Sequence, residues 1–205
     1  DTFYDIDDAG NRNLLEEALS SSVKRFAYLS CYGGRVLGAI EYIRAHESFA
    51  SALRTSGIDS VVVRTTVAFS RLEQLLQRAL AKDRVSVVGT GEARTNPIHQ
   101  ADLASALVDA LEGHEQDVDV GGPEVLSLTE IAQIAAEVAG DARVSYTFTW
   151  IEQWKTALRR FYSRHNYDVS MHFLAESAVD VIAPVAGERT LRDHFREIIA
   201  SQASS

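Results

Sequence analysis

The side chains best suited to chemistry lie in one short stretch of the sequence. Tyr42 and His46 are four residues apart, so on a helix they share a face and can contact each other. Ser30 and Cys31 stand just upstream, at the end of an apolar run typical of a strand. A thiol beside an imidazole can act as a nucleophile, which makes Cys31 and His46 a candidate hydrolytic pair. The alternatives are that Tyr42 and His46 belong to a buried helix face, and that the lone cysteine is inert or only lines a site.

Two glycine clusters resemble nucleotide-binding loops but lack residues that such loops need. The first, Gly33-Gly34 to Gly38, has the gap of a phosphate-binding loop, yet Ala39-Ile40 stand where that loop carries Lys and Ser or Thr. The second, Gly89-Thr90-Gly91, begins like a dinucleotide-binding turn, but Arg94 replaces the third glycine. We interpret the second cluster as a turn, and the sequence contains no complete dinucleotide fingerprint.

Composition and charge exclude several classes of protein. Hydrophobic residues make up 46% of the 205 residues and charged residues 24%, as in an ordinary globular protein. Lys and Arg total 20 against 29 Asp and Glu, and the net charge of -9 disfavours nucleic acid and anionic membranes as partners. Cys31 is the single cysteine, and the histidines show no metal-ligand spacing. We therefore expect a cytoplasmic protein with no disulfide, no metal, no nucleic acid and no membrane partner.

Strands and helices alternate along the first part of the chain, and these elements must position the candidate residues. Helices are predicted over 7–21, 40–55 and 101–111, and strands over 23–30, 61–63, 85–88 and 118–120. Capping boxes at Ser70 to Glu73 and at Ser127 to Glu130 predict the starts of two further helices. This order predicts an α/β fold, in which a parallel sheet flanked by helices (1–125) precedes a smaller, mainly helical subdomain (126–205).

Apolar residues at helical spacing mark the C-terminal part. One stripe consists of Trp150, Trp154, Leu158 and Phe161, and another of Leu191, Phe195 and Ile198. We expect Trp150, Trp154 and Phe161 to pack the tail onto the sheet rather than to bind a ligand.

Several ordered segments together resemble one family. Asp8 to Ala18 and then Val23 to Ser30 look like that family's fourth helix and fifth strand. Thr55 to Arg64 resembles its next strand, and Asn96 to Ala104 and Val120 to Pro123 resemble its later landmarks. The family is that of the NAD(P)-binding epimerase-like proteins, the extended and atypical short-chain dehydrogenases/reductases, including the NmrA-like branch. The resemblance covers nearly the whole chain and implies the C-terminal part of a Rossmann-like sheet.

The resemblance also implies an active site built from a Ser or Thr at a strand end and a Tyr-x-x-x-Lys motif. Ser30, with Cys31 beside it, takes the first position and Tyr42 the second, whereas His46 replaces the lysine. In the family, the tyrosine exchanges a proton with the substrate, and the lysine lowers the pKa of that tyrosine and holds the nicotinamide ribose. A histidine with an ordinary pKa of about 6.5 is mostly neutral at pH 7, so it stabilises a tyrosinate less.

The implied cofactor is NAD or NADP, bound at the carboxyl ends of the strands. The residues expected to face its nicotinamide end are Ser30, Cys31, Tyr32, Gly33, Arg64, Thr65 and Thr66. Arg64-Thr65 departs from the family's Arg-Pro. The family's glycine-rich turn under the pyrophosphate is not among these residues. We therefore expect a missing N-terminal segment or a homo-oligomer to cover the apolar edge of the sheet.

Three functions remain open from the sequence. The first is an NAD(P)-dependent oxidoreductase or epimerase acting on a small carbonyl or hydroxyl substrate, with Tyr42 as acid/base and Ser30 polarising the substrate oxygen. The second is a non-catalytic NAD(P)-sensing or protein-binding regulator of the NmrA-like type, which a histidine at position 46 favours. The third is a truncated copy that binds no dinucleotide.

Overall fold

Three parallel strands form the main sheet, in the order β1-β2-β5. The structure is a computed structural model that describes residues 3–38, 40–82, 84–140, 142–159, 167, 171 and 174–203. The strands are β1 (Arg25–Cys31), β2 (Asp59–Thr65) and β5 (Asp117–Val120). Ser30 is paired with Arg64 and Cys31 with Thr65, so the carboxyl ends of β1 and β2 lie side by side.

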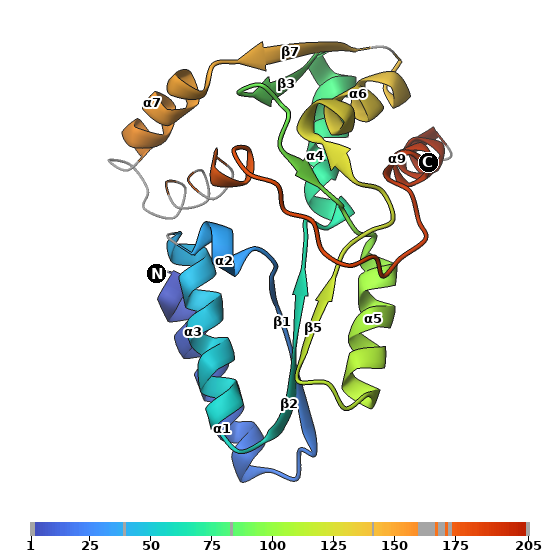
Figure 1. Cartoon of the computed structure of the whole chain (residues 1–205). Coiled ribbons are helices and arrows are strands. Elements are labelled where there is room, and N and C mark those ends of the chain that lie inside the picture. Colours follow the sequence, from blue (N-terminus) through green and yellow to red (C-terminus); the bar gives the residue numbers. More distant parts are fainter. Residues whose placement is uncertain are drawn as a thin grey trace.

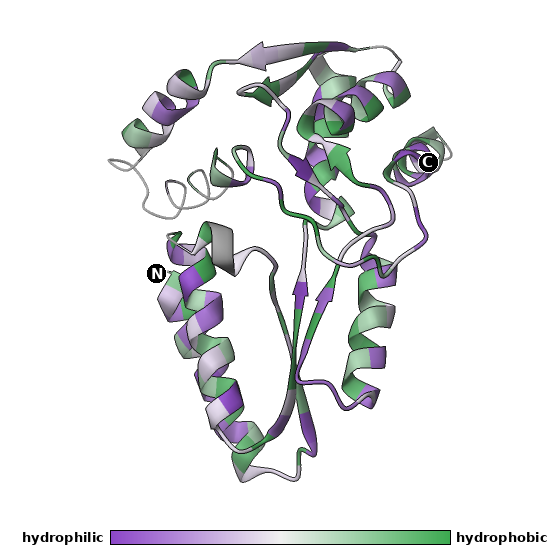
Figure 2. Cartoon of the chain, viewed as in Figure 1, coloured by the Kyte–Doolittle hydropathy of each residue, from purple (hydrophilic) through white to green (hydrophobic). Residues whose placement is uncertain are grey.

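Helices cover both faces of this sheet (Figure 1). The π-helix η1 (Tyr4–Gly10), α1 (Asn11–Ser20) and α3 (Glu41–Thr55) lie on one face, and α5 (Gln100–Glu112) lies on the other. Because successive strand side chains point to opposite faces, Tyr28 and Val62 pack toward α3, while Val61 and Val63 pack toward α5. Hydrophobic and hydrophilic residues are mixed along α3 and α5, as expected for helices with one side against a sheet (Figure 2). The short helix α2 (Gly34–Leu37) links β1 to α3.

A second group of elements lies beyond the carboxyl ends of the strands (Figure 1). It contains α4 (Phe69–Lys82), β3 (Arg84–Val88), α6 (Leu128–Val138), β7 (Arg143–Thr147), α7 (Thr149–Arg159) and α9 (Leu191–Ala203). β3 pairs in parallel with β7, and the buried core includes Phe69, Leu76, Ile131, Leu191 and Phe195. Helix α4 and strand β3 thus pack on elements from 126–205, whereas the division at residue 125 stays a prediction.

Short bridges join the two groups. β4 (Arg94–Thr95) pairs antiparallel with β6 (Leu126–Ser127). Single bridges link Thr95 to Val181 and Gly121 to Val185, so the segment before α9 passes between the two groups (Figure 1). Strand β4 and the end of β5 therefore lie against a segment that comes some sixty residues or more later in the chain.

The α/β class and its parallel sheet are confirmed, and so is the capping box of α6. Ser127 accepts a hydrogen bond from the Glu130 N–H, and the Glu130 carboxylate accepts one from the Ser127 N–H. The other predicted box is wrong, because α4 already begins at Phe69 and the Glu73 carboxylate instead lies 3.0 Å from His194 Nε2.

The expected packing of the tryptophan stripe is also wrong. The side chains of Trp150 and Trp154 on α7 are 61% and 67% exposed, so they do not pack the tail onto the sheet. The helical spacing correctly predicted a helix, but spacing alone does not say whether a neighbour covers the apolar side. Phe161 lies outside the described residues. Within the described part of the chain, no helix is long and apolar enough to cross a membrane.

Asp102 ties α5 to the segment before α9. Its Oδ2 accepts hydrogen bonds from the N–H groups of Glu188 at 3.2 Å and Arg189 at 3.1 Å, and its Oδ1 pairs with the Arg189 guanidinium. Burial alone would raise the pKa of Asp102, but these hydrogen bonds outweigh burial and lower it. A Cβ on Gly187 would lie 2.7 Å from Asp102 Oδ2, so the loop encloses the carboxylate closely.

We expect Asp102→Asn to lower the free energy of unfolding at pH 7 by about 1–3 kcal/mol, because charge-assisted hydrogen bonds are lost. Since the folded-state pKa of Asp102 is lowered, its contribution is complete above the unfolded-state pKa of about 4. The contribution is lost as the pH falls further, so wild type and variant should converge in acid. Urea unfolding from pH 7 to pH 3 measures this, with the exposed Asp109→Asn on the same helix as control. An energy difference that does not change with pH would contradict it.

Candidate functional site

Cys31, Tyr42 and His46 come together where β1 ends and α3 begins, and Ser30 precedes Cys31 on β1. The Cys31 thiol and the Tyr42 hydroxyl form a hydrogen bond. The rings of Tyr42 and His46 meet edge-on, with centroids 4.6 Å apart. Ser30 is buried, and His46 belongs to the buried face of α3. The predicted contact between Tyr42 and His46 is thus present, while the catalytic roles of Ser30, Tyr42 and His46 stay predictions.

The electrostatics of Cys31 oppose the hydrolytic alternative. Burial raises the pKa of the Cys31 thiol to about 11, so the thiolate needed for nucleophilic attack is scarce at neutral pH. Burial is also the main cause that raises the pKa of Tyr42, and the neighbouring Cys31 adds to it. The pair is therefore neutral at pH 7, and Tyr42 can donate a proton but rarely exists as tyrosinate.

His46 has a partner that the sequence did not reveal. Its Nδ1 lies 2.6 Å from the Tyr28 hydroxyl, and its Nε2 lies 3.9 Å from Asp7 Oδ1. Tyr28 stands two residues before Ser30, and side chains two apart on a strand share a face. That spacing is the signal by which Tyr28 could have been found.

Two hydroxyl groups at the strand ends are buried without a hydrogen-bond partner in the described part of the chain. They are Ser30 Oγ on β1 and Thr65 Oγ1 on β2. A buried hydroxyl that makes no hydrogen bond costs free energy, and such groups ordinarily find a partner. Both positions therefore offer hydrogen bonds to a ligand or a water molecule at the carboxyl ends of the strands.

The remaining residues expected at the cofactor are engaged within the chain. Arg64 Nε donates to Glu47 Oε1 at 2.9 Å, and its Nη1 donates to Asp117 Oδ1 at 2.6 Å. Thr66 Oγ1 donates to a backbone carbonyl at 2.6 Å. Tyr32 is held through its backbone N–H, and Gly33 adopts a φ of 106°, a left-handed conformation that favours glycine. Cofactor contacts of all these residues stay predictions.

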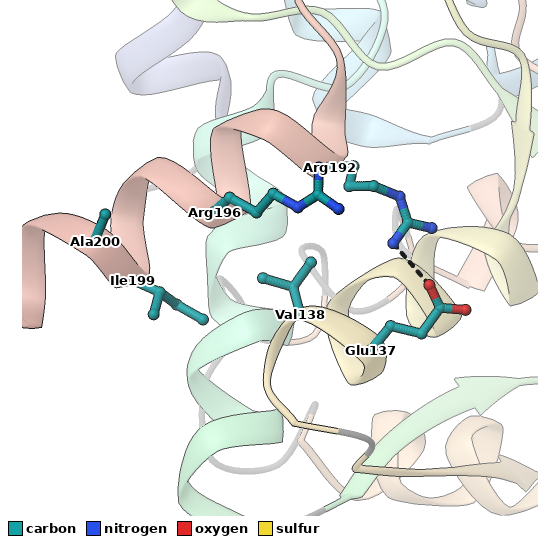
Figure 3. A pocket seen from close by; sticks show the side chains of 6 residues that line it. All are labelled: Glu137, Val138, Arg192, Arg196, Ile199 and Ala200. Carbon is teal, nitrogen blue, oxygen red and sulfur yellow. Dashed lines mark ion pairs between the residues drawn. The ribbon is translucent and has the colours of Figure 1, made fainter.

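Two hollows of the described surface lie away from these residues. One, of about 380 Å³, lies between α6 and α9 (Figure 3). Arg192 and Arg196 reach over Val138 there, and Arg192 pairs with Glu137 at 2.7 Å. The other, of about 660 Å³, lies beside Asp102 and residues 185–189. In the described part of the chain, no group of three or more His, Cys, Asp or Glu side chains could hold a metal ion.

The fold can now be compared with known proteins. No family model and no curated protein matches the sequence. A nucleoside-diphosphate-sugar epimerase from Staphylococcus aureus is 17% identical with a TM-score of 0.68, over 90% of this chain and 69% of that one. UDP-glucose 4-epimerase from Thermus thermophilus, in complex with NAD, is 20% identical with a TM-score of 0.61, over 71% and 58%. ADP-L-glycero-D-manno-heptose-6-epimerase from Helicobacter pylori is 17% identical with a TM-score of 0.62, over 97% and 66%.

These likenesses confirm the family resemblance at the level of the fold. The chain has the Rossmann-like α/β fold of these epimerase structures, with its parallel sheet and flanking helices. It spans between 58% and 69% of the length of the three structures above. At 17–20% identity, substrate and chemistry do not transfer with the fold.

Proposed function

We propose that the protein is an NAD(P)-dependent oxidoreductase or epimerase that acts on a small carbonyl or hydroxyl compound. The convergence of Cys31, Tyr42 and His46 at the carboxyl end of β1, with Ser30 beside Cys31, carries this proposal. In open α/β sheets, ligands bind at that end of the strands. The similar structures include nucleoside-diphosphate-sugar epimerases, which supports a nucleotide-linked sugar as the substrate class. We also propose that the protein is cytoplasmic.

The residues at the strand ends fit the nicotinamide end of a dinucleotide. The unpartnered hydroxyls of Ser30 and Thr65 supply hydrogen bonds there, and Gly33 lets the backbone turn sharply after β1. The neighbour from Thermus thermophilus holds NAD, which supports a cofactor of this class, NAD or NADP. When bound, the cofactor would accept or supply a hydride.

The chain's own residues would move the proton. Tyr42 keeps its proton at neutral pH and donates it to a substrate oxygen as charge develops on that oxygen. The buried Ser30 hydroxyl orients the same oxygen by a hydrogen bond. His46, edge-on to Tyr42, holds the phenol ring in place. Because burial raises the pKa of Tyr42, the phenol is protonated at neutral pH but is a weaker acid than an unburied tyrosine, which limits its rate as a proton donor.

We expect Tyr42→Phe to reduce turnover by at least about a hundredfold, because the acid/base group is lost. The ring still packs against His46, so the melting temperature should change little. Turnover with NADH and NADPH is measured over a panel of nucleotide-linked sugars and small carbonyl compounds. The control is Tyr146→Phe on exposed β7, which should not affect turnover. Unchanged turnover in Tyr42→Phe would exclude the assigned role.

One observation favours a second candidate, a cofactor-sensing protein without catalysis. His46 replaces the family's lysine. The Tyr42 hydroxyl is hydrogen-bonded to Cys31, and burial raises the pKa of Tyr42. Thermal melting with NAD(H) and NADP(H) separates the candidates when it is run beside the activity screen. Stabilisation without turnover supports the sensor, and neither stabilisation nor turnover supports a copy that binds no dinucleotide.

The free edge of β1 supports the proposal that another chain or segment covers it. β1 pairs only with β2 among the described residues, and Leu29 on this strand and Leu14 on α1 are exposed. We propose a homo-oligomer or an additional N-terminal segment as the cover. Light scattering of the 205-residue chain should give a dimer or larger species, and Leu29→Lys should weaken it. Leu80→Lys on α4 is the control. A monodisperse wild-type monomer would contradict the homo-oligomer and leave the segment to be tested by extending the chain.

A further inference from the structure

Tyr28 occupies a place between the sheet and His46 that the family resemblance does not assign. It lies on β1, is buried, and meets Phe49 edge-on with ring centroids 4.6 Å apart. Its ring also stacks on His46, with centroids 5.9 Å apart and an angle of 28° between the planes. Packing on both sides leaves the phenol one position, and its hydroxyl therefore reaches His46 from a fixed direction.

The contact joins Tyr28 Oη and His46 Nδ1, and the tautomer of His46 decides which of the two atoms donates. Tyr28 Oη is 2.6 Å from His46 Nδ1. Burial raises the pKa of Tyr28, and the negative charge of Asp7 adds to this, so the phenol keeps its proton at neutral pH. A neutral imidazole carries one proton, and a phenol that donates to Nδ1 requires that proton to be on Nε2.

We propose that Tyr28 is a positioning residue that fixes the orientation and the Nε2–H tautomer of His46. This inference rests on the proposed function, in which His46 takes the place of the family's lysine beside Tyr42. As a consequence, the His46 ring meets the Tyr42 ring with a defined edge. The two ring centroids are 4.6 Å apart, and the ring planes form an angle of 75°. His46 then supports the proton donor Tyr42 as a group of fixed geometry.

Charged groups from three elements surround the pair. Asp7 on η1 lies 3.9 Å from His46 Nε2, and its neighbour Asp8 is paired with Arg12 at 3.0 Å. Glu47 on α3 is paired with Arg64. The facing groups that can affect a pH profile are Asp7, Asp8, Cys31, Tyr42, Glu47 and, on α4, Arg71. Asp7 is the carboxylate that faces the Nε2 edge, where it favours a proton on that nitrogen.

The decisive experiment is nitrogen-15 NMR of histidine-labelled protein, with the His46 signals assigned through a His46→Gln variant. In wild type we expect Nε2 to be protonated and Nδ1 to be an unprotonated, hydrogen-bonded nitrogen. In Tyr28→Phe, the Nδ1 signal should move downfield as the hydrogen bond is lost, whereas Tyr146→Phe should leave it in place. We expect kcat of Tyr28→Phe to fall roughly fivefold to tenfold with KM unchanged, because that change corresponds to the net free energy of one hydrogen bond.

Each outcome decides the inference. A wild-type spectrum with the proton on Nδ1 overturns it, and this result does not depend on the folding of any variant. A shifted Nδ1 signal with unchanged kcat and pH profile shows a purely structural contact and also overturns it. If wild type shows neither turnover nor dinucleotide stabilisation, the proposed function fails, while the spectrum still decides whether Tyr28 fixes the tautomer.

Discussion

Asn96→Ala is expected to lower the free energy of unfolding by about 3–5 kcal/mol, since three buried hydrogen bonds disappear together. Asn96 is fully buried where the end of β2, the end of β5 and the segment before α9 meet. Its Nδ2 donates to the Ala183 carbonyl at 2.8 Å and to the Gly122 carbonyl at 3.1 Å, and its Oδ1 accepts from the Ala183 N–H at 2.9 Å. Alanine would leave these backbone groups buried without partners.

Thermal and urea unfolding of Asn96→Ala measure the effect. For a chain of this length, the expected loss corresponds to a fall in melting temperature of roughly 10 °C. The control is Asn13→Ala on the exposed side of α1, which should change stability by less than about 0.5 kcal/mol. A loss below about 1 kcal/mol in Asn96→Ala would show that the backbone groups find other partners, which would contradict the expected cost of losing three buried hydrogen bonds.

The sequence predicts the local elements of this junction but not their meeting. Gly121-Gly122-Pro123 correctly predicts the end of β5, because glycine and proline interrupt strands. Nothing in the pattern shows that Asn96 bonds Ala183, because 87 residues separate them and the contact forms only when β4, β5 and the last segment pack together. Periodicity reports which side of an element is apolar, and it does not identify the partner of that side. Trp150 and Trp154 show the same limitation, because their spacing predicts an apolar helix side but both side chains are exposed.

The candidate site was predictable to a similar degree. The four-residue spacing predicts that Tyr42 and His46 meet on one helix face, and they do. The contact between Tyr28 and His46 depends on the distance between β1 and α3, which hydrophobic packing sets and spacing does not express. The engagement of Arg64 by Glu47 and Asp117 likewise needs three elements in place. Contacts within one element follow from its period, whereas contacts between elements require the fold.

Gly122→Ala is expected to cost at least about 3 kcal/mol, because the added methyl group has no space. Its Cβ would lie 1.7 Å from the Pro97 carbonyl oxygen, which is backbone and can move only if the junction opens. At Gly121 the Cβ would instead meet the Asn96 side chain, 2.3 Å from Nδ2. Removing that side chain should therefore relieve Gly121→Ala but not Gly122→Ala.

Urea unfolding of both glycine variants, alone and combined with Asn96→Ala, tests this difference. The cost of Gly121→Ala should fall by at least about 1 kcal/mol in the Asn96→Ala background, because directly contacting residues are energetically coupled. The cost of Gly122→Ala should stay the same there. Gly10→Ala is the control, because Gly10 has a helical φ of -60° and an added Cβ would make only an ordinary contact, 3.8 Å from the Asp5 carbonyl oxygen, so alanine should be neutral or stabilising. Equal costs for Gly121→Ala and Gly122→Ala in both backgrounds would mean that the junction yields as a whole, contrary to the rigid backbone contact between Pro97 and Gly122.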